Sequence, residues 1–319
     1  MDQIRVEAPA SSANLGPGFD VFALALDSPR DSVRLRLGKS SGGGAPSVRM
    51  ARVSGLEVPK MEDENGACVV CLEMARQFGA KKEIIVELEK RVPIGLGMGS
   101  SGASAAAAAV ATNDLLGLGL SSDELIFYAG KGEAATSGTP HYDNVSASIL
   151  GGFVVVRGGE GERPTAVRFE PPPGLAVCVA TPVVSLPSRK TEYARSLLPE
   201  SVSLETLVSN VANASLMVSG FAKKDIKLIG KGMTDRAVEE ARKTMIPGYD
   251  RVRSRAADAG AAGVCISGAG PSVLAIVDKK RSAPKKVLAA MLAAFGQESV
   301  KSSGYVTRIG EGARVVKSS

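Results

Sequence analysis

Three glycines at alternate positions, Gly95, Gly97 and Gly99, precede two serines and an alanine-rich segment within residues 93–112, PIGLGMGSSGASAAAAAVAT. Glycine permits positive φ angles and leaves backbone N–H groups uncovered. The N-terminus of the helix that the alanines predict adds unpaired N–H groups and a partial positive charge. With the strand-like residues 84–90 before it, the segment indicates a phosphate site. It is neither a Walker A nor a dinucleotide-binding motif, so tight packing of a small-residue helix remains the alternative.

Two further segments concentrate polar side chains. Residues 8–20, APASSANLGPGFD, separate two apolar segments and contain Asn14 and Asp20. Such a long loop in a compact domain is commonly functional. Residues 132–144 follow a predicted helix and contain Glu133, His141, Asp143 and Asn144. Both clusters are candidate ligand sites, and the alternatives are turn chemistry for the first and a structural imidazole for the only histidine.

Composition limits the possible functions. The 319 residues suffice for two domains, and 44% hydrophobic with 23% charged residues is typical of a globular protein. The net charge of +6 comes without tryptophan and with 4% aromatic residues, which favours a small anionic substrate over nucleic acid. No apolar run is long enough to cross a membrane and the N-terminus lacks signal-peptide features, so we expect a cytoplasmic protein. Cys68 and Cys71 lack a second pair, which predicts buried thiols rather than a zinc site.

The elements that must position these residues follow from periodicity. In the first half, the pattern predicts strands at 4–8, 21–26, 33–37, 48–53, 84–90 and 151–157. It predicts helices at 62–78 and 121–129, in addition to the alanine-rich helix after the glycines. Residues 158–173 are rich in Gly, Glu and Pro and predict the join to a second domain. In the second half, the pattern predicts strands at 175–180, 263–267, 273–277 and 304–309. It predicts helices at 190–198, 204–218, 233–245 and 285–295. This order is typical of an α+β protein with an antiparallel sheet in its second half.

Three separated segments resemble the motifs of the GHMP kinases, the superfamily of galactokinase, homoserine kinase, mevalonate kinase and phosphomevalonate kinase. They are APASSANLGPGFD at 8–20, PIGLGMGSSGAS at 93–104 and SGAGPS at 267–272. Met98 and Gly102 depart from the commoner GLGSSA form, and neither exchange threatens phosphate binding.

Within the superfamily, the chain is most similar to the homoserine kinases. ANLGPGFD in the first motif and PHYDNV at 140–145 resemble the forms found in that family. TEYAR, ending at Arg195 and followed by LLP, and EAR, ending at Arg242 and followed at 246–249 by IPGY, resemble its two arginine segments.

The resemblance implies a two-domain GHMP kinase architecture of the α+β class. Residues 1–160 would form a ribosomal-S5-domain-2-like N-terminal domain that binds ATP. Residues 161–319 would form a ferredoxin-like antiparallel α+β C-terminal domain. The nucleotide would be bound by Pro93, Ile94, Gly95, Leu96, Gly97, Met98, Gly99, Ser100, Ser101, Gly102 and Ala103.

The resemblance also implies Mg²⁺, held by Ser101 and Glu133, which match the family's magnesium positions. Oxygen ligands of this kind are those that Mg²⁺ prefers. Two ligands form a sparse shell that the nucleotide phosphates would complete. Whether Ser101 or Ser100 faces the metal stays open.

The implied reaction is ATP-dependent phosphorylation of the side-chain hydroxyl of L-homoserine to O-phospho-L-homoserine, in threonine biosynthesis. Two arginines suit the carboxylate, because guanidinium groups bind carboxylates bidentately. Asp20 suits the ammonium or the hydroxyl. The implied substrate-binding residues are Asn14, Asp20, His141, Thr191, Arg195 and Arg242.

Three residues are candidates for the chemistry itself: Asn144, Asp20 and Asp143. Asp143 matches an aspartate that other family members use as a base. We nevertheless favour direct in-line transfer without a protein base, so that catalysis depends on positioning and charge stabilisation.

Two other functions stay open. One is a GHMP kinase for another small alcohol, mevalonate or shikimate; the arginine pair and PHYDNV argue against mevalonate. The other is a non-catalytic nucleotide-binding protein of the same fold. No nucleic acid or membrane partner is expected, and the family implies a possible homodimer.

Overall fold

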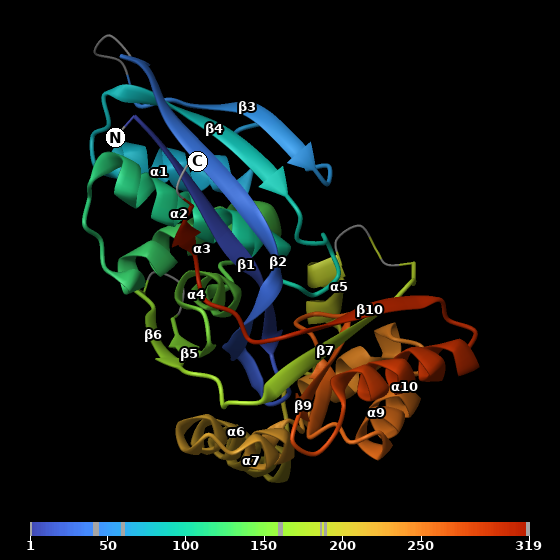
Figure 1. Ribbon diagram of the computed structural model, residues 1–319. Coiled ribbons are helices and arrows are strands. Elements are labelled where there is room, and N and C mark those ends of the chain that lie inside the picture. Colours follow the sequence, from blue (N-terminus) through green and yellow to red (C-terminus); the bar gives the residue numbers. More distant parts are fainter. Residues whose placement is uncertain are drawn as a thin grey trace.

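Two β-sheets and the helices packed against them make up the structure (Figure 1). It is a computed structural model that describes residues 2–40, 45–58, 61–158, 162–185, 187 and 190–316. The α+β class predicted from the sequence is confirmed, with a mixed first sheet and an antiparallel second one.

The first sheet contains seven strands in the described part of the chain. Its central order is β11-β1-β2-β4-β3, and β5 and β6 extend it from β2. All its pairs are antiparallel except β3 with β4, which are joined by a crossover helix. The strands are β1 (Gln3–Asn14), β2 (Gly18–Ser40), β3 (Val48–Gly55), β4 (Lys82–Lys90), β5 (Phe153–Arg157), β6 (Thr165–Phe169) and β11 (Arg314–Val315).

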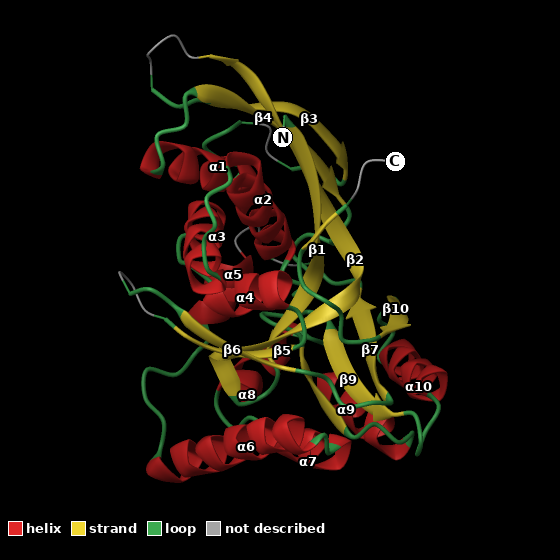
Figure 2. Cartoon of the chain, turned by 60° about the vertical axis from the view of Figure 1, so that its left-hand side comes forward, coloured by secondary structure: helices red, strands yellow, loops and turns green. Residues whose placement is uncertain are grey.

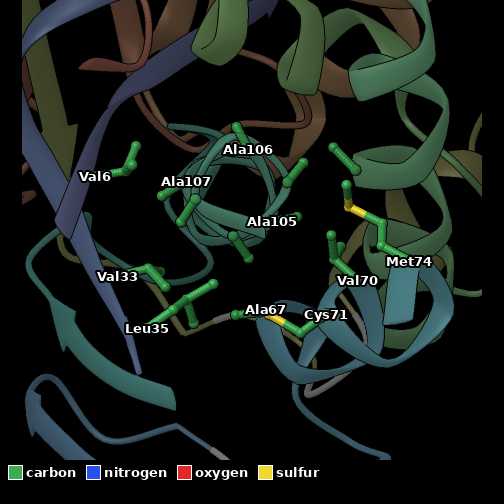
Figure 3. Close-up of a cluster of buried hydrophobic side chains, with 14 of the residues drawn as sticks. Val6, Val33, Leu35, Ala67, Val70, Cys71, Met74, Ala105, Ala106 and Ala107 are labelled. Atoms are coloured by element: carbon green, nitrogen blue, oxygen red, sulfur yellow. The ribbon is translucent and has the colours of Figure 1, made fainter. Parts of the chain in front are cut away.

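Four helices cover one face of this sheet, as Figure 2 shows. They are α1 (Gly66–Gln77), α2 (Ser100–Leu116), α3 (Ser122–Ser137) and α4 (Tyr142–Leu150). Helix α2 is enclosed by the sheet, α1 and the other helices (Figure 3), so its residues 105–109 are fully buried alanines. Small side chains let α2 approach its neighbours closely, and a helix that is apolar all round is typical of such a buried position.

The second sheet has the order β10-β7-β9-β8 and is antiparallel throughout. Its strands are β7 (Leu175–Pro182), β8 (Gly263–Ile266), β9 (Val273–Asp278) and β10 (Ser302–Thr307). The accompanying helices are α5 (Lys190–Ser196), α6 (Leu204–Lys223), α7 (Ile226–Gly232), α8 (Val238–Arg242), α9 (Tyr249–Asp258) and α10 (Pro284–Gln297), with a 3₁₀ turn at Lys243–Met245.

Alternate residues of β7 and β9 face two different cores. Cys178 and Ala275 pack with α9 and α10 on one side of the second sheet. Val177 and Leu274 pack on the other side with α6, α7 and the end of the first sheet that is next to the β1–β2 turn. There Phe153 of β5 stacks on Phe221 of α6 at a ring separation of 4.0 Å. This shared core joins the two sheets.

Residues 8–20 are not the long loop that their composition predicted. β1 continues to Asn14 and β2 begins at Gly18, which leaves a turn of three residues. Ser11 and Ser12 are fully buried in β1, and their hydroxyl groups contact Asn144 and Ser267. The polar side chains are tolerated in a buried strand because tertiary hydrogen bonds satisfy them.

Several helix predictions also need correction. Helix α3 runs to Ser137 instead of ending near Ala129, so Glu133 lies in a helix, and the rest of the polar cluster spans a short loop and the start of α4. The helix expected over 233–245 is confined to α8 and the 3₁₀ turn. Asp235 explains the late start, because its carboxylate accepts hydrogen bonds from the backbone N–H groups of Ala237 and Glu239. Helices α4, α7 and α9 were not predicted.

The division at residue 160 falls outside the described residues and stays a prediction. The strand pairing shows that β6 and β11, both beyond that position, belong to the first sheet. The four cysteines are buried, as predicted. In the described part of the chain, every helix is too short or too polar to cross a membrane.

Candidate functional site

A cavity of about 930 Å³ brings together all three polar segments. The glycine loop lines one side, and residues of α5, α8 and the adjoining ends of β1 and β2 line the other, with the start of α4 between them. The predicted residues that line it are Asn14, Asp20, Ile94, Gly95, Gly97, Met98, Gly99, Ser100, Ser101, Glu133, His141, Asp143, Asn144, Thr191, Arg195 and Arg242. Four residues predicted to bind the nucleotide are not among those that line it: Pro93, Leu96, Gly102 and Ala103.

The glycine loop needs its glycines for two reasons. Gly95, Gly97 and Gly99 have φ angles of 73°, 77° and 59°, in the region that side chains disfavour. A Cβ atom at Gly97 would also lie 2.1 Å from the carbonyl oxygen of Ser267, and one at Gly99 would lie 2.1 Å from Ser11 Oγ. The loop is therefore in close contact with β1 and with the turn after β8.

Helix α2 begins at this loop without a side-chain cap, since its N-cap residue is Gly99. Its first backbone N–H groups therefore have no capping side chain to accept their hydrogen bonds. This end of the helix faces the cavity through Ser100 and Ser101. Uncapped N–H groups and the helix dipole together suit an anion such as a phosphate.

The two serines at the start of α2 have different partners. Ser100 donates a hydrogen bond to the carbonyl oxygen of Val92, 2.8 Å away. Ser101 donates to Glu133 Oε1 of α3, 2.9 Å away, and His141 Nδ1 lies 3.3 Å from the same oxygen. Burial lowers the pKa of His141, but the hydrogen bond and charge of Glu133 outweigh it, so the pKa lies above its usual value.

A buried ion pair beneath the glycine loop was missed by the sequence reasoning. Lys90, only 3% exposed, donates hydrogen bonds to Asp31, to the carbonyl oxygen of Ser100 and to Ser104 Oγ. Asp31 in turn accepts from the backbone N–H groups of residues 91 and 92, both at 2.8 Å. The pair links the end of β4 to the first turn of α2 and so fixes both ends of the loop.

On the opposite side of the cavity, Asp20 and Arg195 form an ion pair. Arg195 Nη2 of α5 lies 3.0 and 2.9 Å from the two carboxylate oxygens of Asp20. Asn14 supports the aspartate by accepting a hydrogen bond from its backbone N–H at 3.2 Å, and it donates to the carbonyl oxygen of Gly268 at 2.9 Å. Asn14 and Asp20 both have positive φ angles, which accords with the tight turn that joins β1 to β2.

Arg242 reaches the same side of the cavity from α8. Its guanidinium group donates to the carbonyl oxygens of Ala194 and Gly268, both at 3.3 Å. The ring of Phe19 lies beneath both guanidinium groups, 5.1 Å from that of Arg242 and 5.3 Å from that of Arg195. Burial lowers the pKa of Arg242 to about 10, which still leaves the group charged at neutral pH.

A third cation, Lys190, was not predicted. It is the first residue of α5, lines the cavity and donates a hydrogen bond of 2.5 Å to the carbonyl oxygen of Gly270. Burial, together with the charge of Arg242, lowers its pKa to about 8. Three cationic side chains thus gather beside Asp20, in a pocket suited to a carboxylate and an ammonium group.

The two residues at the start of α4 lie between these two sides. Asp143 is 2% exposed, and its Oδ1 accepts hydrogen bonds from the backbone and side-chain N–H groups of Asn144. Asn144 Oδ1 accepts a hydrogen bond of 2.9 Å from Ser11. Burial, and next the charge of Asp20, raises the pKa of Asp143 to about 6.

The turn at residues 267–272 connects the segments around the cavity. Ser267 Oγ donates to the carbonyl oxygen of Gly97 at 2.7 Å and lies 2.8 Å from Ser12 Oγ. The backbone N–H of Gly268 donates to the carbonyl oxygen of Ala13 at 3.1 Å. Through the carbonyl oxygens of Gly268 and Gly270, the same turn also holds Asn14, Arg242 and Lys190.

Among the described residues, no cluster of three or more His, Cys, Asp or Glu side chains has the arrangement of a metal site. Ser101 and Glu133 offer hard oxygen donors 2.9 Å apart at the end of the glycine loop, which is a set suited to Mg²⁺ when phosphate oxygens complete it.

Known proteins resemble this chain in sequence and in structure. Residues 66–152 match the family described as the GHMP kinases N terminal domain, and residues 217–297 match GHMP kinases C terminal. A homoserine kinase of Halorubrum lacusprofundi is 41% identical over 98% of this chain and 99% of its own length. One of Thermoplasma volcanium is 38% identical over 87% of this chain and 85% of its own.

The crystal structure of homoserine kinase from Cytophaga hutchinsonii superposes with a TM-score of 0.88 at 36% identity, and covers 99% of this chain and 98% of that one. The agreement extends over both sheets. The two-domain architecture with a mixed N-terminal sheet and an antiparallel C-terminal sheet is therefore shared.

Proposed function

The chain belongs to the homoserine kinase family of the GHMP kinases, and we propose that it transfers the γ-phosphoryl group of ATP to the side-chain hydroxyl of L-homoserine. The products are ADP and O-phospho-L-homoserine, a step of threonine biosynthesis. The observation that carries the proposal is the arrangement of one cavity, in which the glycine loop faces Arg195, Arg242 and Asp20. A phosphoryl donor and a small zwitterion would thus meet in a single site.

The nucleotide half of the proposal rests on backbone groups. The glycine loop and the uncapped start of α2 supply N–H groups for the phosphates of ATP. Their positions are set by the contact of Gly97 with Ser267 and by the ion pair of Lys90 and Asp31. A rigid cradle of this kind favours the transferring group without any covalent chemistry by the protein.

Mg²⁺ would be held by Glu133 and Ser101, with phosphate oxygens as further ligands. When bound there, the ion would neutralise charge on the β- and γ-phosphates. Ser101 is the better candidate of the two serines, because its hydroxyl contacts Glu133, whereas the hydroxyl of Ser100 donates to the carbonyl oxygen of Val92. His141 contacts the same oxygen of the Glu133 carboxylate as Ser101 and helps to orient that carboxylate.

The substrate half rests on charged side chains. Arg242 and Arg195 would bind the carboxylate of homoserine, and Asp20 would bind its ammonium group. Thr191 and Asn14 line the same part of the cavity and can complete the polar contacts. Because Arg195 is already paired with Asp20, the two ends of the substrate amino acid would each meet one member of a preformed ion pair.

In the transfer, a bond forms between the homoserine oxygen and the γ-phosphorus, and the bond from that phosphorus to the β–γ bridging oxygen breaks. The hydroxyl proton passes to an oxygen of the transferred group, without a protein base. Asn144, held by Ser11, lies next to the start of α2 and would orient the reacting hydroxyl. Catalysis then depends on alignment and on charge stabilisation.

A panel assay of ADP release tests the proposal, with L-homoserine, mevalonate and shikimate as acceptors. We expect kcat/KM for L-homoserine to exceed that for the other alcohols by about 100-fold or more, since unpaired polar groups in the pocket would disfavour them. Preference for mevalonate or shikimate would indicate a sibling kinase. Failure of every alcohol to stimulate ADP release would favour the non-catalytic alternative. The homodimer, the cytoplasmic location and the division at residue 160 remain predictions.

A further inference from the structure

Helix α8 carries a buried acid that does not line the cavity. Glu239 is 4% exposed and lies one helical turn before Arg242. Its Oε2 accepts a hydrogen bond of 3.1 Å from the backbone N–H of Ile266, at the end of β8. Its Oε1 accepts one from the hydroxyl of Tyr249 in α9, and Arg253 Nη1 lies 3.5 Å from the same oxygen. One carboxylate thus joins α8 to a strand and to another helix.

Helix α8 depends on such contacts because it has only five residues. A helix this short is unstable by itself, since the cost of its first turn is not recovered by further hydrogen bonds. Asp235 satisfies the N–H groups at its start, and Asn210 of α6 donates to that aspartate at 2.7 Å. Asp235 therefore fixes where the helix begins, and Glu239 fixes its distance from β8 and α9.

The contact of Glu239 with Ile266 is close to the target of Arg242. Ile266 directly precedes the turn at residues 267–272, and Gly268 in that turn accepts the hydrogen bond from Arg242. Two hydrogen bonds therefore connect α8 to this segment, one from Ile266 to Glu239 and one from Arg242 to Gly268. Together with the chain between the residues they form a closed ring. A shift of α8 relative to β8 would therefore change the distance between the Arg242 guanidinium and the turn.

We propose that Glu239 is a positioning residue that sets the place of the Arg242 guanidinium in the cavity. The inference rests on the proposed function, in which Arg242 binds the substrate carboxylate. A carboxylate bidentately held by one guanidinium needs both hydrogen bonds in a fixed geometry, so a displaced guanidinium would bind the substrate more weakly.

The cost of burying the Glu239 carboxylate suggests that this side chain does more than stabilise the fold. Burial raises the pKa of Glu239 to about 7, against the opposing effects of Tyr249, Ile266 and Arg253. A buried carboxylate is costly to keep, and an apolar residue of similar volume would commonly serve stability as well. The acid touches no residue of the glycine loop and reaches it only indirectly, through Ile266 and the turn that follows, whereas it shares a short helix with Arg242. Its effect should therefore be much larger on the substrate side than on the nucleotide side.

The test compares steady-state kinetics of Glu239→Ala, Glu239→Gln and Tyr249→Phe with those of the wild type. We expect KM for L-homoserine to rise about 30-fold in Glu239→Ala and about 3- to 10-fold in the other two, each of which removes only part of the contacts. KM for ATP and kcat should stay within about twofold of the wild-type values. Glu240→Gln, on the exposed side of the same helix and paired with Lys243, is the matched control and should behave as the wild type.

The outcomes separate positioning from a merely structural role. A structural role would lower the melting temperature and the active fraction, hence kcat, and leave both KM values unchanged; that result would overturn the inference. So would equal rises in KM for ATP and for homoserine. If Glu239→Ala does not fold, Glu239→Gln and Tyr249→Phe decide the question. If the wild type prefers another carboxylate-bearing alcohol, the same comparison is made with that alcohol, so that the proposed function and the role of Glu239 can fail separately.

Discussion

The proposed nucleotide side and the proposed substrate side of the cavity are built in different ways. The nucleotide side is one continuous segment that lines the cavity between Ile94 and Ser101, up to the uncapped start of α2. The substrate side is assembled from side chains of α5, α8 and the adjoining ends of β1 and β2, and it depends on the ion pair of Asp20 with Arg195 and on carbonyl groups of the 267–272 turn. A site made of backbone groups is therefore sensitive to added atoms. A site made of side chains is sensitive to the loss of a charge and to the loss of residues that hold the charged groups in place.

The largest effect that this contrast predicts is that of a single methyl group in the loop. In Gly97→Ala, the new Cβ would lie 2.1 Å from the carbonyl oxygen of Ser267, so the loop or the turn must move. We expect kcat/KM for ATP to fall by about 100-fold or more, because a displacement of about 1 Å misaligns the phosphates. Steady-state kinetics with ATP as the varied substrate measures this.

Gly95→Ala is the matched variant for that prediction. Gly95 has a similar φ angle of 73°, but nothing lies within 4 Å of its Cβ position. Only the left-handed backbone then costs energy, about 1–2 kcal/mol, and the loss in kcat/KM should be at most about 5- to 30-fold. Equal losses in the two variants would show that backbone conformation, and not the contact with Ser267, governs this side.

The two sides of the cavity also differ in how much of their structure could be predicted from the sequence. The loop at 95–99, the start of α2 and most strands were predicted because glycine spacing, alanine content and alternation are local properties. The alternation of β4 even contained an unused signal, since it places Lys90 on the buried face with Ile84, Val86 and Leu88. A lysine on an apolar face predicts a buried ion pair, and its partner Asp31 is 59 residues away.

The substrate side was less accessible to the sequence. Arg195, Arg242 and Asp20 were found through the family resemblance, because nothing in their local pattern brings them together. Phe19 and Lys190 had no local signal at all, since their roles depend on tertiary contacts with residues more than seventy positions away. The polar residues of β1 predicted a loop for the same reason: their hydrogen-bond partners, Asn144 and Ser267, are supplied by other segments.

A second prediction concerns the boundary between the two sides, at Ser101 and Glu133. Glu133→Gln keeps the shape of the side chain but removes its charge, so we expect the Mg²⁺ concentration for half-maximal activity to rise about tenfold or more. ADP release measured over a series of free Mg²⁺ concentrations tests this. Glu73→Gln, which removes a carboxylate that contacts α3 through Lys131 and lies away from the cavity, is the control. An unchanged Mg²⁺ requirement in Glu133→Gln would contradict the assignment of this ligand.

The smallest effect is expected at Asp143, where both sides meet. Its Oδ1 accepts hydrogen bonds from Asn144, which an asparagine oxygen can still accept, so Asp143→Asn should retain kcat within about tenfold. A general base would instead contribute about 10²- to 10⁴-fold. Asp114→Asn is the matched control, because Asn113 donates to that exposed carboxylate in the same way.

The pH dependence of Asp143→Asn distinguishes the two possibilities further. The folded pKa of about 6 lies above the usual value of 3.8, so the stability linked to this group is present at low pH and is lost as the pH rises through 6. Asp143→Asn should therefore melt at a temperature that depends less on pH between 4 and 7 than that of the wild type. If Asp143 acts as a base, wild-type kcat should decrease below pH 6. The Asp143→Asn variant should then lose most of its turnover and should not show this decrease. If transfer is direct, the two proteins share one pH–rate profile, and Asp143 serves only to hold Asn144 in place.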